Sequence, residues 1–550
     1  MCSRYYLNYY KKYVMMFMFL FLCLMILVEY LLSEVYVFEW VLFFFYDFHI
    51  SLGLIFDQNS WVFTFTVVMV YLSVWFYSSV YMESETYLDR FTKIMTVFMG
   101  SMLILIHSNG LMTSMVGWDG LGITSMILIM YYSSNSALKS SIFTFMINRL
   151  GDSFFMILVI LSYCVHSSSV LYNGTASWII SLFLILTSMT KSSQFPFSSW
   201  LVKAMEAPTP VSSLVHSSTL VTAGAYLIII HKEVWCGGFG LLMFLSMSAF
   251  ITMMVANLSS LMEMDLKKII AYSTLSQLSF IYVCISLHMA DQAFFYMIMH
   301  AFFKAMMFMV VGFVIHYSSG WQDIRILGLN QMSTPCMMNI FVASSLSLCG
   351  MPYLSGFFSK DLVVDLFTSL NFSLFFFSFL GLSFGFSCVY CIRMGWYLGV
   401  MTKKVICYKL DDEVMISSML VLYILSCLMG GASYWIMGPM GVGIDSPKIL
   451  LIFLLMVISW KFWNFFNIKW MNVYMKTGFY LNLAINYVHS FLFFFSFEFI
   501  CSSDMGLASK LCYTRKYSVN KLIDSNYFKI ISMFVDFKEI LVLGVFLVMI

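Results

Sequence analysis

The chain has 550 residues, of which 61% are hydrophobic and 10% are charged, and its mean hydropathy is +0.89. Soluble domains carry about 25% charged residues, so this composition excludes a soluble globular protein. The formal net charge is +2 and no basic tract is present, so no nucleic-acid partner is expected. A span needs about 20 apolar residues, and we therefore predict an all-α polytopic membrane protein with about 14–16 transmembrane helices.

The N-terminal region begins with an aromatic and basic segment, Tyr5–Lys12, which is followed by the apolar run Val14–Leu32. This run is long for the apolar core of a signal peptide, so we expect a first transmembrane helix and no cleaved leader. Glu34–Phe56 is aromatic and contains several acids, and we expect part of it to lie at the membrane interface.

The remaining predicted spans are apolar runs separated by short polar segments, among them the charged loop Met82–Arg90. Each run is long enough, or nearly long enough, to cross the hydrocarbon core as a helix. The predicted spans are Trp61–Tyr81, Phe91–His107, Leu111–Tyr132, Ser141–Val165, Trp178–Thr190, Gly238–Met262, Ile269–Ser286, Ala293–Tyr317, Ser373–Val400, Val414–Met437 and Ile449–Phe466.

The C-terminal tail has a different pattern, because charges return every few residues between Cys501 and Glu539 while apolar residues stay interleaved. This pattern is typical of a helix that lies on a surface or in the membrane interface. A single helix over Phe491–Asp536 would be about 70 Å long at 1.5 Å per residue, and it would overhang one bundle. We therefore predict a long lateral amphipathic helix, followed by the short apolar run Ile540–Ile550.

The segment from Leu182 to His231 is the most informative part of the chain. It is apolar, yet it contains several ionisable residues and three of the chain's seven prolines. A charge at the bilayer centre costs roughly 2.5–3.5 kcal/mol on insertion scales, and a proline removes a helix hydrogen bond that lipid cannot replace. The combination predicts a broken helix around a polar path, which favours ion or proton transport. Pro352 followed by Lys360 weakly repeats this pattern later in the chain, as in transporters built from two related halves.

Two charged residues in apolar sequence are candidate partners in the first half. Asp119 lies in the glycine-rich run Gly117–Gly122, and Lys191 precedes the prolines. Burial disfavours the charged form of a lysine, and a nearby carboxylate favours it. Moving the acid or a second cation would therefore make the amine take up or release a proton. We expect Asp119 and Lys191 to form such a pair.

Further titratable residues continue the series. His216 is flanked by serines and a threonine whose hydroxyl groups can hold a water chain. His300 and Lys304 are four residues apart and share one helix face, in line to pass a proton laterally. Lys360, beside Asp361, is the expected next station.

Other polar residues in apolar sequence have more than one interpretation. Arg149 and Asp152 form either a structural ion pair or the end of a proton path, and the structural pair is favoured. Lysines at helix ends either reach the headgroups or serve the path; these are Lys203, Lys232, Lys267 and Lys268. His107 and His316 are interpreted as interhelical hydrogen bonders.

The 13 cysteines are scattered, mostly within apolar runs, and are interpreted as small packing residues. Cys388 and Cys391 form a C-x-x-C pair, a spacing that also occurs in metal and redox sites. Their flanks are apolar and no second pair is near in sequence, so the packing interpretation is preferred.

The motifs in this part of the chain resemble those of the antiporter-like subunits of respiratory complex I. They occur in order over about half of the chain, which makes the resemblance specific. The matching runs are Gly117–Ile123, Asn148–Asp152, Lys191–Gln194, Met205–Thr219, Asp265–Gln277, His300–Ala305, Gln322–Arg325, Gly350–Pro352 and Gly356–Asp361.

The resemblance implies two inverted five-helix repeats, each with a broken helix, and a hydrophilic axis at the membrane midplane. By match, Asp119 is the acidic partner, Lys191 the lysine of the first channel and His216 a relay residue. Lys304 forms the bridge together with His300. Glu206, Lys268, Arg149, Asp152 and Asp361 are implied supporting residues.

The last proton-carrying lysine is implied to be Lys360, on the side where protons leave. Two positions depart from the family pattern. Asp119 stands where a Glu is usual, so its contact with Lys191 must be closer or bridged by water. Tyr296 stands where the family often has a second His, which changes the detail of the relay at His300.

The sequence divides into five expected parts. Residues 1–109 hold N-terminal transmembrane helices, and two antiporter-like repeats follow. The parts are 1–109, 110–235, 236–400, 401–490 with additional transmembrane helices, and 491–550 with the lateral helix and a short terminal anchor.

The resemblance implies a proton-translocating subunit of NADH:ubiquinone reductase (EC 7.1.1.2) in the mitochondrial inner membrane. It implies no redox site and no metal in this chain; FMN, iron–sulfur clusters and ubiquinone belong to other subunits. Expected partners are the neighbouring antiporter-like subunit, other membrane-arm and accessory subunits, and phospholipids such as cardiolipin. Two alternatives stay open: a subunit of a sodium/proton antiporter or membrane hydrogenase, and a passive membrane scaffold.

Overall fold

The computed structural model describes part of the chain. The described residues all belong to one compact unit, residues 1–482, and a second unit spans residues 483–550. They are residues 35–45, 48–83, 85–167, 174–231, 239–318, 320–325, 335–351, 354–369, 374–399 and 413–436. The predicted spans Val14–Leu32 and Ile449–Phe466, and the predicted lateral helix, lie outside the described residues.

The first described element is a β-hairpin, which the all-α prediction missed. Strand β1 (Tyr36–Phe45) pairs antiparallel with β2 (Phe48–Phe56), and a bulge lies between Val41 and Phe43. The run is rich in aromatic and β-branched residues, which suit a strand better than a helix. Main-chain hydrogen bonds tie β2 to the end of the second helix that follows, with Ile55 N 2.7 Å from His107 O. The expected interfacial segment is therefore an ordered hairpin.

Five helices follow, and they pack in sequence order. Contacts join α2 to α3, α3 to α4, α4 to α5 and α5 to α6. Each begins or ends within a few residues of a predicted span, because the apolar runs end at polar turns. The helices are α2 (Gln58–Tyr81), α3 (Leu88–Ile106), α4 (Leu111–Ile129, extended by the short helix η1, Met130–Tyr132), α5 (Asn135–Ser167) and α6 (Gly174–Lys191).

The predicted helix break is confirmed. Helix α6 ends at Lys191, and the chain then runs as short pieces before it continues as a helix. The prolines explain the interruptions, and Pro210 lies in the first turn of a new helix, where its missing N–H costs nothing. The pieces are α7 (Ser199–Lys203), η2 (Ala204–Glu206), α8 (Thr209–Leu214), the π-helical turn η3 (Val215–Thr219) and α9 (Leu220–Ile230).

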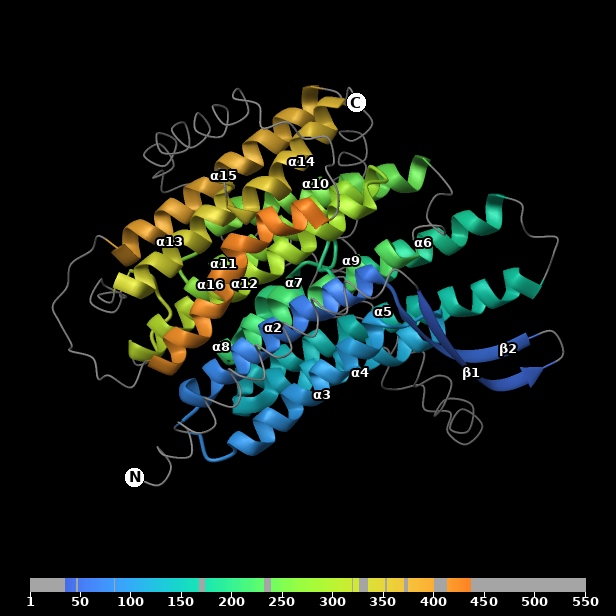
Figure 1. The fold of residues 1–550 in the computed structure, drawn as a ribbon, viewed down its shortest axis with the longest axis horizontal. Helices are drawn as coiled ribbons and strands as arrows, with labels where there is room; N and C mark the ends of the chain where they lie inside the picture. The colour runs from blue at the N-terminus through green and yellow to red at the C-terminus, as the bar shows by residue number, and fades with distance from the viewer. Residues whose placement is uncertain are drawn as a thin grey trace, which may run out of the picture. The chain divides into compact units, whose positions relative to one another are not determined.

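The second group of helices surrounds α12, which is the centre of the described fold (Figure 1). Helix α12 contacts α2, α8, α9, α11, α13, α14 and α16, and its side chains are buried along nearly its whole length. A helix that is apolar all round belongs inside a bundle. The helices are α10 (Phe239–Met262), α11 (Leu266–Ser286), α12 (Ala290–Tyr317), α13 (Pro335–Cys349), α14 (Ser355–Ser369), α15 (Leu374–Gly399) and α16 (Glu413–Ile436).

Elements far apart in the sequence meet in this bundle. Helix α16, orange in Figure 1, lies beside α2, drawn in blue. Within the described residues, eight helices are long and apolar enough to cross a membrane, and three shorter apolar helices accompany them. The prediction of a polytopic helical membrane protein is therefore confirmed, while the inverted repeats and the total helix number stay predictions.

Candidate functional site

An ion-pair cluster joins α4 to α5. The Nη1 atom of Arg149 lies 3.0 Å from a carboxylate oxygen of Asp152 and 3.5 Å from one of Asp119. Asp152 is almost fully buried, whereas Arg149 and Asp119 each keep about a third of their side-chain exposure. Arg149 and Asp152 do form the ion pair favoured from the sequence, and the same guanidinium also holds Asp119.

Lys191 lies fully buried at the C-terminal end of α6. Its Nζ donates a hydrogen bond of 3.2 Å to the main-chain carbonyl of Trp118 and lies 5.0 Å from the centre of that indole ring. A cation at this end of a helix interacts favourably with the helix dipole. Gly122 lies beside the amine, since a Cβ there would be 3.4 Å from Nζ, an ordinary van der Waals contact.

The sequence left the Asp119–Lys191 contact either close or bridged by water, and the close alternative is wrong: among the described residues, the ion-pair partner of Asp119 is Arg149. The Lys191 amine instead meets the α4 main chain one residue earlier. Asp152 and Asp119 are both close enough to act electrostatically on Lys191, Asp152 more strongly. Lys191 therefore faces a cluster of two acids and one arginine, and not a single carboxylate.

His216 lies in the π-helical turn η3, which interrupts the α8–α9 helix. The ring is fully buried, and neither of its nitrogens has a hydrogen-bond partner among the described residues. Its ring centre is 6.2 Å from that of Trp200, whose Nε1 donates to the carbonyl of Thr190, next to Lys191. Buried polar atoms usually have a hydrogen-bond partner, so the His216 ring is a candidate binding site for water.

His300 and Lys304 lie one turn apart in the centre of α12, and both are fully buried. Lys304 Nζ donates a hydrogen bond of 2.5 Å to Ser273 Oγ on α11. Both ring nitrogens of His300 lack a partner among the described residues. Tyr296, which stands where the family often has a His, donates its hydroxyl proton to Gln277 on α11. It is thus tied to a neighbouring helix one turn before His300.

Lys360 enters the interior from α14 and is also buried. Its Nζ donates to the carbonyl of Leu348 and lies 3.4 Å from Ser387 Oγ on α15. Close packing of α13 and α14 makes this reach possible, since a Cβ on Gly356 would clash with the carbonyl oxygen of Ser347. The side chain of Asp361, an expected supporting residue, lies outside the described ones.

Two neighbouring lysines at the start of α11, Lys267 and Lys268, lie in different surroundings. Lys268 is partly exposed and pairs with Asp265 at 2.6 Å. Lys267, next to it, is buried and donates 3.1 Å to the carbonyl of Ala207, close enough to exposed Glu206 to feel its charge. Both lysines were left open between the headgroups and the interior, and Lys267 is the inner one of the two.

Two polar partners were missed from the sequence. Ser273 accepts a hydrogen bond from Lys304, and Gln194 accepts a 2.6 Å hydrogen bond from Thr252 on α10. Both lie inside runs that carry the family resemblance, Asp265–Gln277 and Lys191–Gln194. The signal that could have found them is the presence of small hydroxyl and amide residues in otherwise apolar helices.

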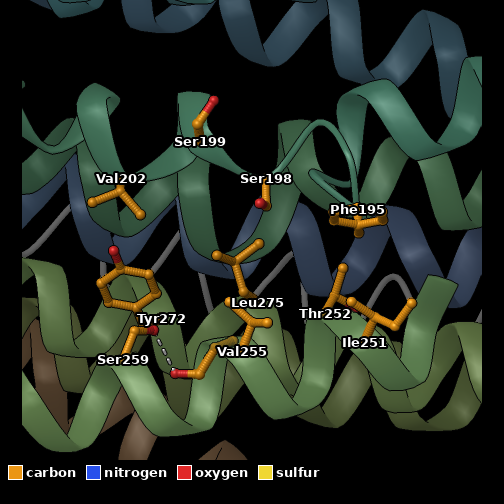
Figure 2. Close-up of a pocket in the computed structure, with 11 residues that line it drawn as sticks. Phe195, Ser198, Ser199, Val202, Ile251, Thr252, Val255, Ser259, Tyr272 and Leu275 are labelled. Atoms are coloured by element: carbon orange, nitrogen blue, oxygen red, sulfur yellow. Dashed lines mark hydrogen bonds between the residues drawn. The ribbon is translucent and has the colours of Figure 1, made fainter. Parts of the chain in front are cut away.

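A pocket of about 30 Å³ lies beside the helix break, which is room for about two water molecules. Figure 2 shows Ser198 and Ser199 from the break on one side, with Thr252 and Ser259 of α10 and Tyr272 of α11 on the other. Its lining combines hydroxyl groups with apolar side chains. The full lining is Phe195, Ser198, Ser199, Val202, Ile251, Thr252, Val255, Ala256, Ser259, Tyr272 and Leu275.

The structure thus brings some of the predicted residues together and leaves others apart. Lys304 and Lys360 are close enough to act on each other electrostatically. Among the described residues, no direct hydrogen bond or ion pair joins Lys191 to His216, or His216 to His300. In the same part of the chain, no group of three or more His, Cys, Asp or Glu side chains is arranged to hold a metal ion. The arrangement can therefore hold protons on separate buried titratable side chains.

Comparison with known proteins gives consistent matches. A family model described as the transmembrane part of NADH:quinone oxidoreductase and Mrp antiporter matches residues 108–387. NADH-ubiquinone oxidoreductase chain 5 of Anopheles quadrimaculatus is 37% identical over 428 residues, which cover 75% of this chain and 73% of that protein. The chain 5 protein of Locusta migratoria is 35% identical over 526 residues, which cover 89% and 91%.

Solved structures share the fold at low sequence identity. A chain of the Mrp complex from a Dietzia species superposes with a TM-score of 0.74 at 19% identity, covering 95% of this chain and 59% of that one. A chain of the membrane-bound sulfane sulfur reductase, an archaeal respiratory membrane complex, gives a TM-score of 0.60 at 19% identity, covering 75% and 85%. These likenesses support the antiporter-like membrane fold.

Proposed function

Because the chain belongs to the NADH:quinone oxidoreductase/Mrp antiporter family of membrane subunits, we propose that it moves protons across the membrane as a core membrane-arm subunit of respiratory complex I. Within the family, the motifs favour the subunit 5 branch, and the curated relatives carry that name. NADH oxidation and ubiquinone reduction take place elsewhere in the complex and drive the proton movement.

The observation that carries this proposal is the burial of three lysines, Lys191, Lys304 and Lys360, at 0%, 0% and 4% exposure inside a helical membrane protein. Each such amine costs several kcal/mol to hold in an apolar interior. A scaffold gains nothing from that cost, because apolar side chains of the same size would pack as well. A group that accepts and releases protons needs an amine in that environment.

In the first half of the chain, the cluster of Asp119, Asp152 and Arg149 controls whether Lys191 is protonated. Arg149 now holds both Asp119 and Asp152. When Arg149 moves away, the two carboxylates act on the Lys191 ammonium without competition and favour its charged form. When Arg149 returns, the carboxylates are neutralised and the lysine releases its proton. Asp119, a methylene shorter than the usual Glu, then acts through this exchange and not through direct contact.

In the second half, the path continues through neutral partners. Among the described residues, the amines of Lys304 and Lys360 donate hydrogen bonds only to hydroxyl and carbonyl oxygens. Water at His216 and His300 links the first half to Lys304, since the ring nitrogens of both have no hydrogen-bond partner among the described residues. Lys360, the last lysine of the series, passes the proton towards the exit.

The same proposal implies the membrane and the partner subunits of this chain. The chain lies in the mitochondrial inner membrane as a multi-pass subunit, beside the neighbouring antiporter-like subunit and accessory subunits, with phospholipids such as cardiolipin around it. It holds no flavin, iron–sulfur cluster or quinone of its own. The predicted lateral helix within residues 491–550 braces its neighbours.

The test is Lys191→Met in the intact complex, with proton pumping and quinone reduction measured together in sealed vesicles. Both are expected to fall by about tenfold or more, because a positioned proton-transfer group contributes roughly 10²–10⁴-fold. Lys139→Met is the matched control: Lys139 is exposed on α5, and its loss is expected to change neither.

A fully assembled Lys191→Met complex that pumps normally would contradict the proposal and favour a passive scaffold. Purification of the native assembly tests the remaining alternative, an antiporter subunit. A complex I subunit is expected to copurify with NADH-oxidising activity in a large multisubunit assembly. An antiporter subunit would be found in an assembly that exchanges sodium for protons without oxidising NADH.

A further inference from the structure

A series of aromatic side chains leads inward from the end of the bundle that lies opposite the β-hairpin. Helix α2 begins next to the hairpin and ends at Tyr81, close to the C-terminal end of α12, where His316 is exposed. The ring centre of His316 is 5.3 Å from that of the half-buried Tyr81. The Tyr81 ring in turn stacks on that of Tyr77, with 5.6 Å between the ring centres, and Tyr77 is fully buried. The three side chains therefore connect the exterior of the described fold to its interior.

The inner end of this series meets the broken helix. Helices α2, α8 and α12 each pack against the other two (Figure 1). Gly312 of α12 leaves the space where they meet, because a Cβ there would clash with the Tyr77 hydroxyl group. The same Cβ would lie 2.7 Å from Oγ1 of Thr209, the first residue of α8. One hydroxyl group from α2 and one from the broken helix therefore approach the same position on α12.

These two hydroxyl groups do not serve the packing of the bundle. Tyr77 and Thr209 are 0% and 1% exposed, and among the described residues neither hydroxyl has a hydrogen bond of ordinary geometry. Thr209 is close enough to influence the phenol groups of both Tyr77 and Tyr81. Burying a hydroxyl group without a good hydrogen bond is unfavourable, and Phe and Val would fill the same space without that cost. Hydroxyl groups at these positions are of use where protons pass, since each can donate and accept a hydrogen bond.

Further polar side chains continue from Thr209 along the broken helix. Ser212 and Ser213 lie one turn beyond Thr209, and His216 lies one turn beyond them. Residues three and four apart are neighbours on a helix, so these side chains follow one face towards the imidazole. All of them are fully buried, and neither nitrogen of His216 has a hydrogen-bond partner in the part of the chain that the structure describes. The series thus ends at a group that can accept a proton.

We propose that Tyr81, Tyr77 and Thr209 form an entry path that carries protons from His316, at the end of the bundle opposite the β-hairpin, to His216 in the broken helix. This rests on the proposed function of the chain and names the residues through which protons reach its first half. Bound water bridges the gaps between the hydroxyl groups. His316, interpreted from the sequence as an interhelical hydrogen bonder, then collects protons at the surface.

Each proton passage along this path conserves atoms and charge. The Tyr81 oxygen takes the proton of the His316 imidazolium while the Tyr81 hydroxyl proton moves on to Tyr77. Tyr77 and Thr209 repeat this exchange, and the last proton binds to a ring nitrogen of neutral His216. Every hydroxyl group ends as a hydroxyl group, no electron is transferred, and one proton has moved from His316 to His216.

The experiment compares Tyr77→Phe and Thr209→Val with Tyr226→Phe in the intact complex. The first two variants each remove one hydroxyl group of the path and keep the shape of the side chain. Tyr226→Phe is the matched control, because Tyr226 is also buried, on α9, but its hydroxyl donates a 3.0 Å hydrogen bond to the carbonyl of Ile106. Thermal stability and coupled proton pumping are measured for all three, at matched amounts of assembled complex.

The two kinds of variant are expected to show opposite results. Tyr77→Phe and Thr209→Val keep their stability, because they lose no good hydrogen bond, and they pump about tenfold more slowly or worse, because a proton-transfer group is missing. Tyr226→Phe loses stability, because a buried carbonyl loses its donor, and pumps at the normal rate. Normal pumping in either of the two path variants would overturn the path.

The solvent deuterium isotope effect separates proton transfer from a packing role. Loss of the Tyr77 hydroxyl makes proton entry rate-limiting, so the isotope effect on turnover is expected to be larger in Tyr77→Phe than in the unmodified complex. A slower variant with an unchanged isotope effect would overturn the path. Lys191→Met measured in parallel separates the two levels. Normal pumping there contradicts the proposed function, whereas lost pumping there together with normal pumping in Tyr77→Phe contradicts the entry path alone.

Discussion

The two halves of the described fold solve the problem of a buried lysine in different ways. Lys191 lies beside Asp119, Asp152 and Arg149, so its charge can be balanced by moving groups that are themselves charged. Among the residues whose side chains the structure describes, no carboxylate lies within ion-pair distance of Lys304 or Lys360; their hydrogen-bond partners are two serine hydroxyls and a main-chain carbonyl.

This difference indicates a division of labour. A cluster of opposite charges can be rearranged by events next to it, so the first half is suited to sense a change in a neighbouring subunit. A lysine among neutral dipoles has no counter-charge to keep its proton, so the second half is suited to pass protons onward. The comparison predicts that the two halves respond differently to changes that preserve charge.

The largest expected effect is that of Lys304→Arg. Arginine keeps the positive charge but does not release its proton at physiological pH. If the second half works by proton transfer, the variant is expected to lose coupled pumping as fully as Lys304→Met, by about 10²-fold or more. Pumping is measured in sealed vesicles at matched amounts of assembled complex. Substantial pumping by Lys304→Arg would show that this position needs only a charge, and the distinction between the halves would fail.

A smaller effect is expected at Asp119. Asp119→Asn removes one of the two carboxylates around Lys191, while Asp152 stays paired with Arg149, so we expect a partial loss of pumping, about tenfold. Asp119→Glu keeps the charge and restores the residue usual in the family, so the rate is expected to stay within about twofold of the original. Turnover titrations of the two variants side by side measure the difference. Equal losses in both would mean that side-chain length, and not charge, matters here.

The elements that could be predicted from the sequence are those with a strong composition signal. The break after Lys191 follows from prolines in apolar sequence, and helices such as α2 and α11 lie within three residues of their predicted bounds. The burial of Lys304 could be predicted for the same reason, since no polar residue lies near it in the sequence apart from His300.

Other features depend on geometry that spacing does not encode. The hairpin was missed because an aromatic run of this length also suits a membrane interface. Arg149 was not recognised as the partner of Asp119, because the rotation of α4 against α5 decides which side chains meet.

The central claim is that separate buried titratable groups are joined by water into one path. The most direct test is a density map of the assembled complex that is detailed enough to place ordered waters around His216 and His300. The account predicts water bound to the ring nitrogens of both, continuing towards Lys191 on one side and Lys304 on the other. Dry apolar packing around both rings, in every conformation of the working complex, would contradict it.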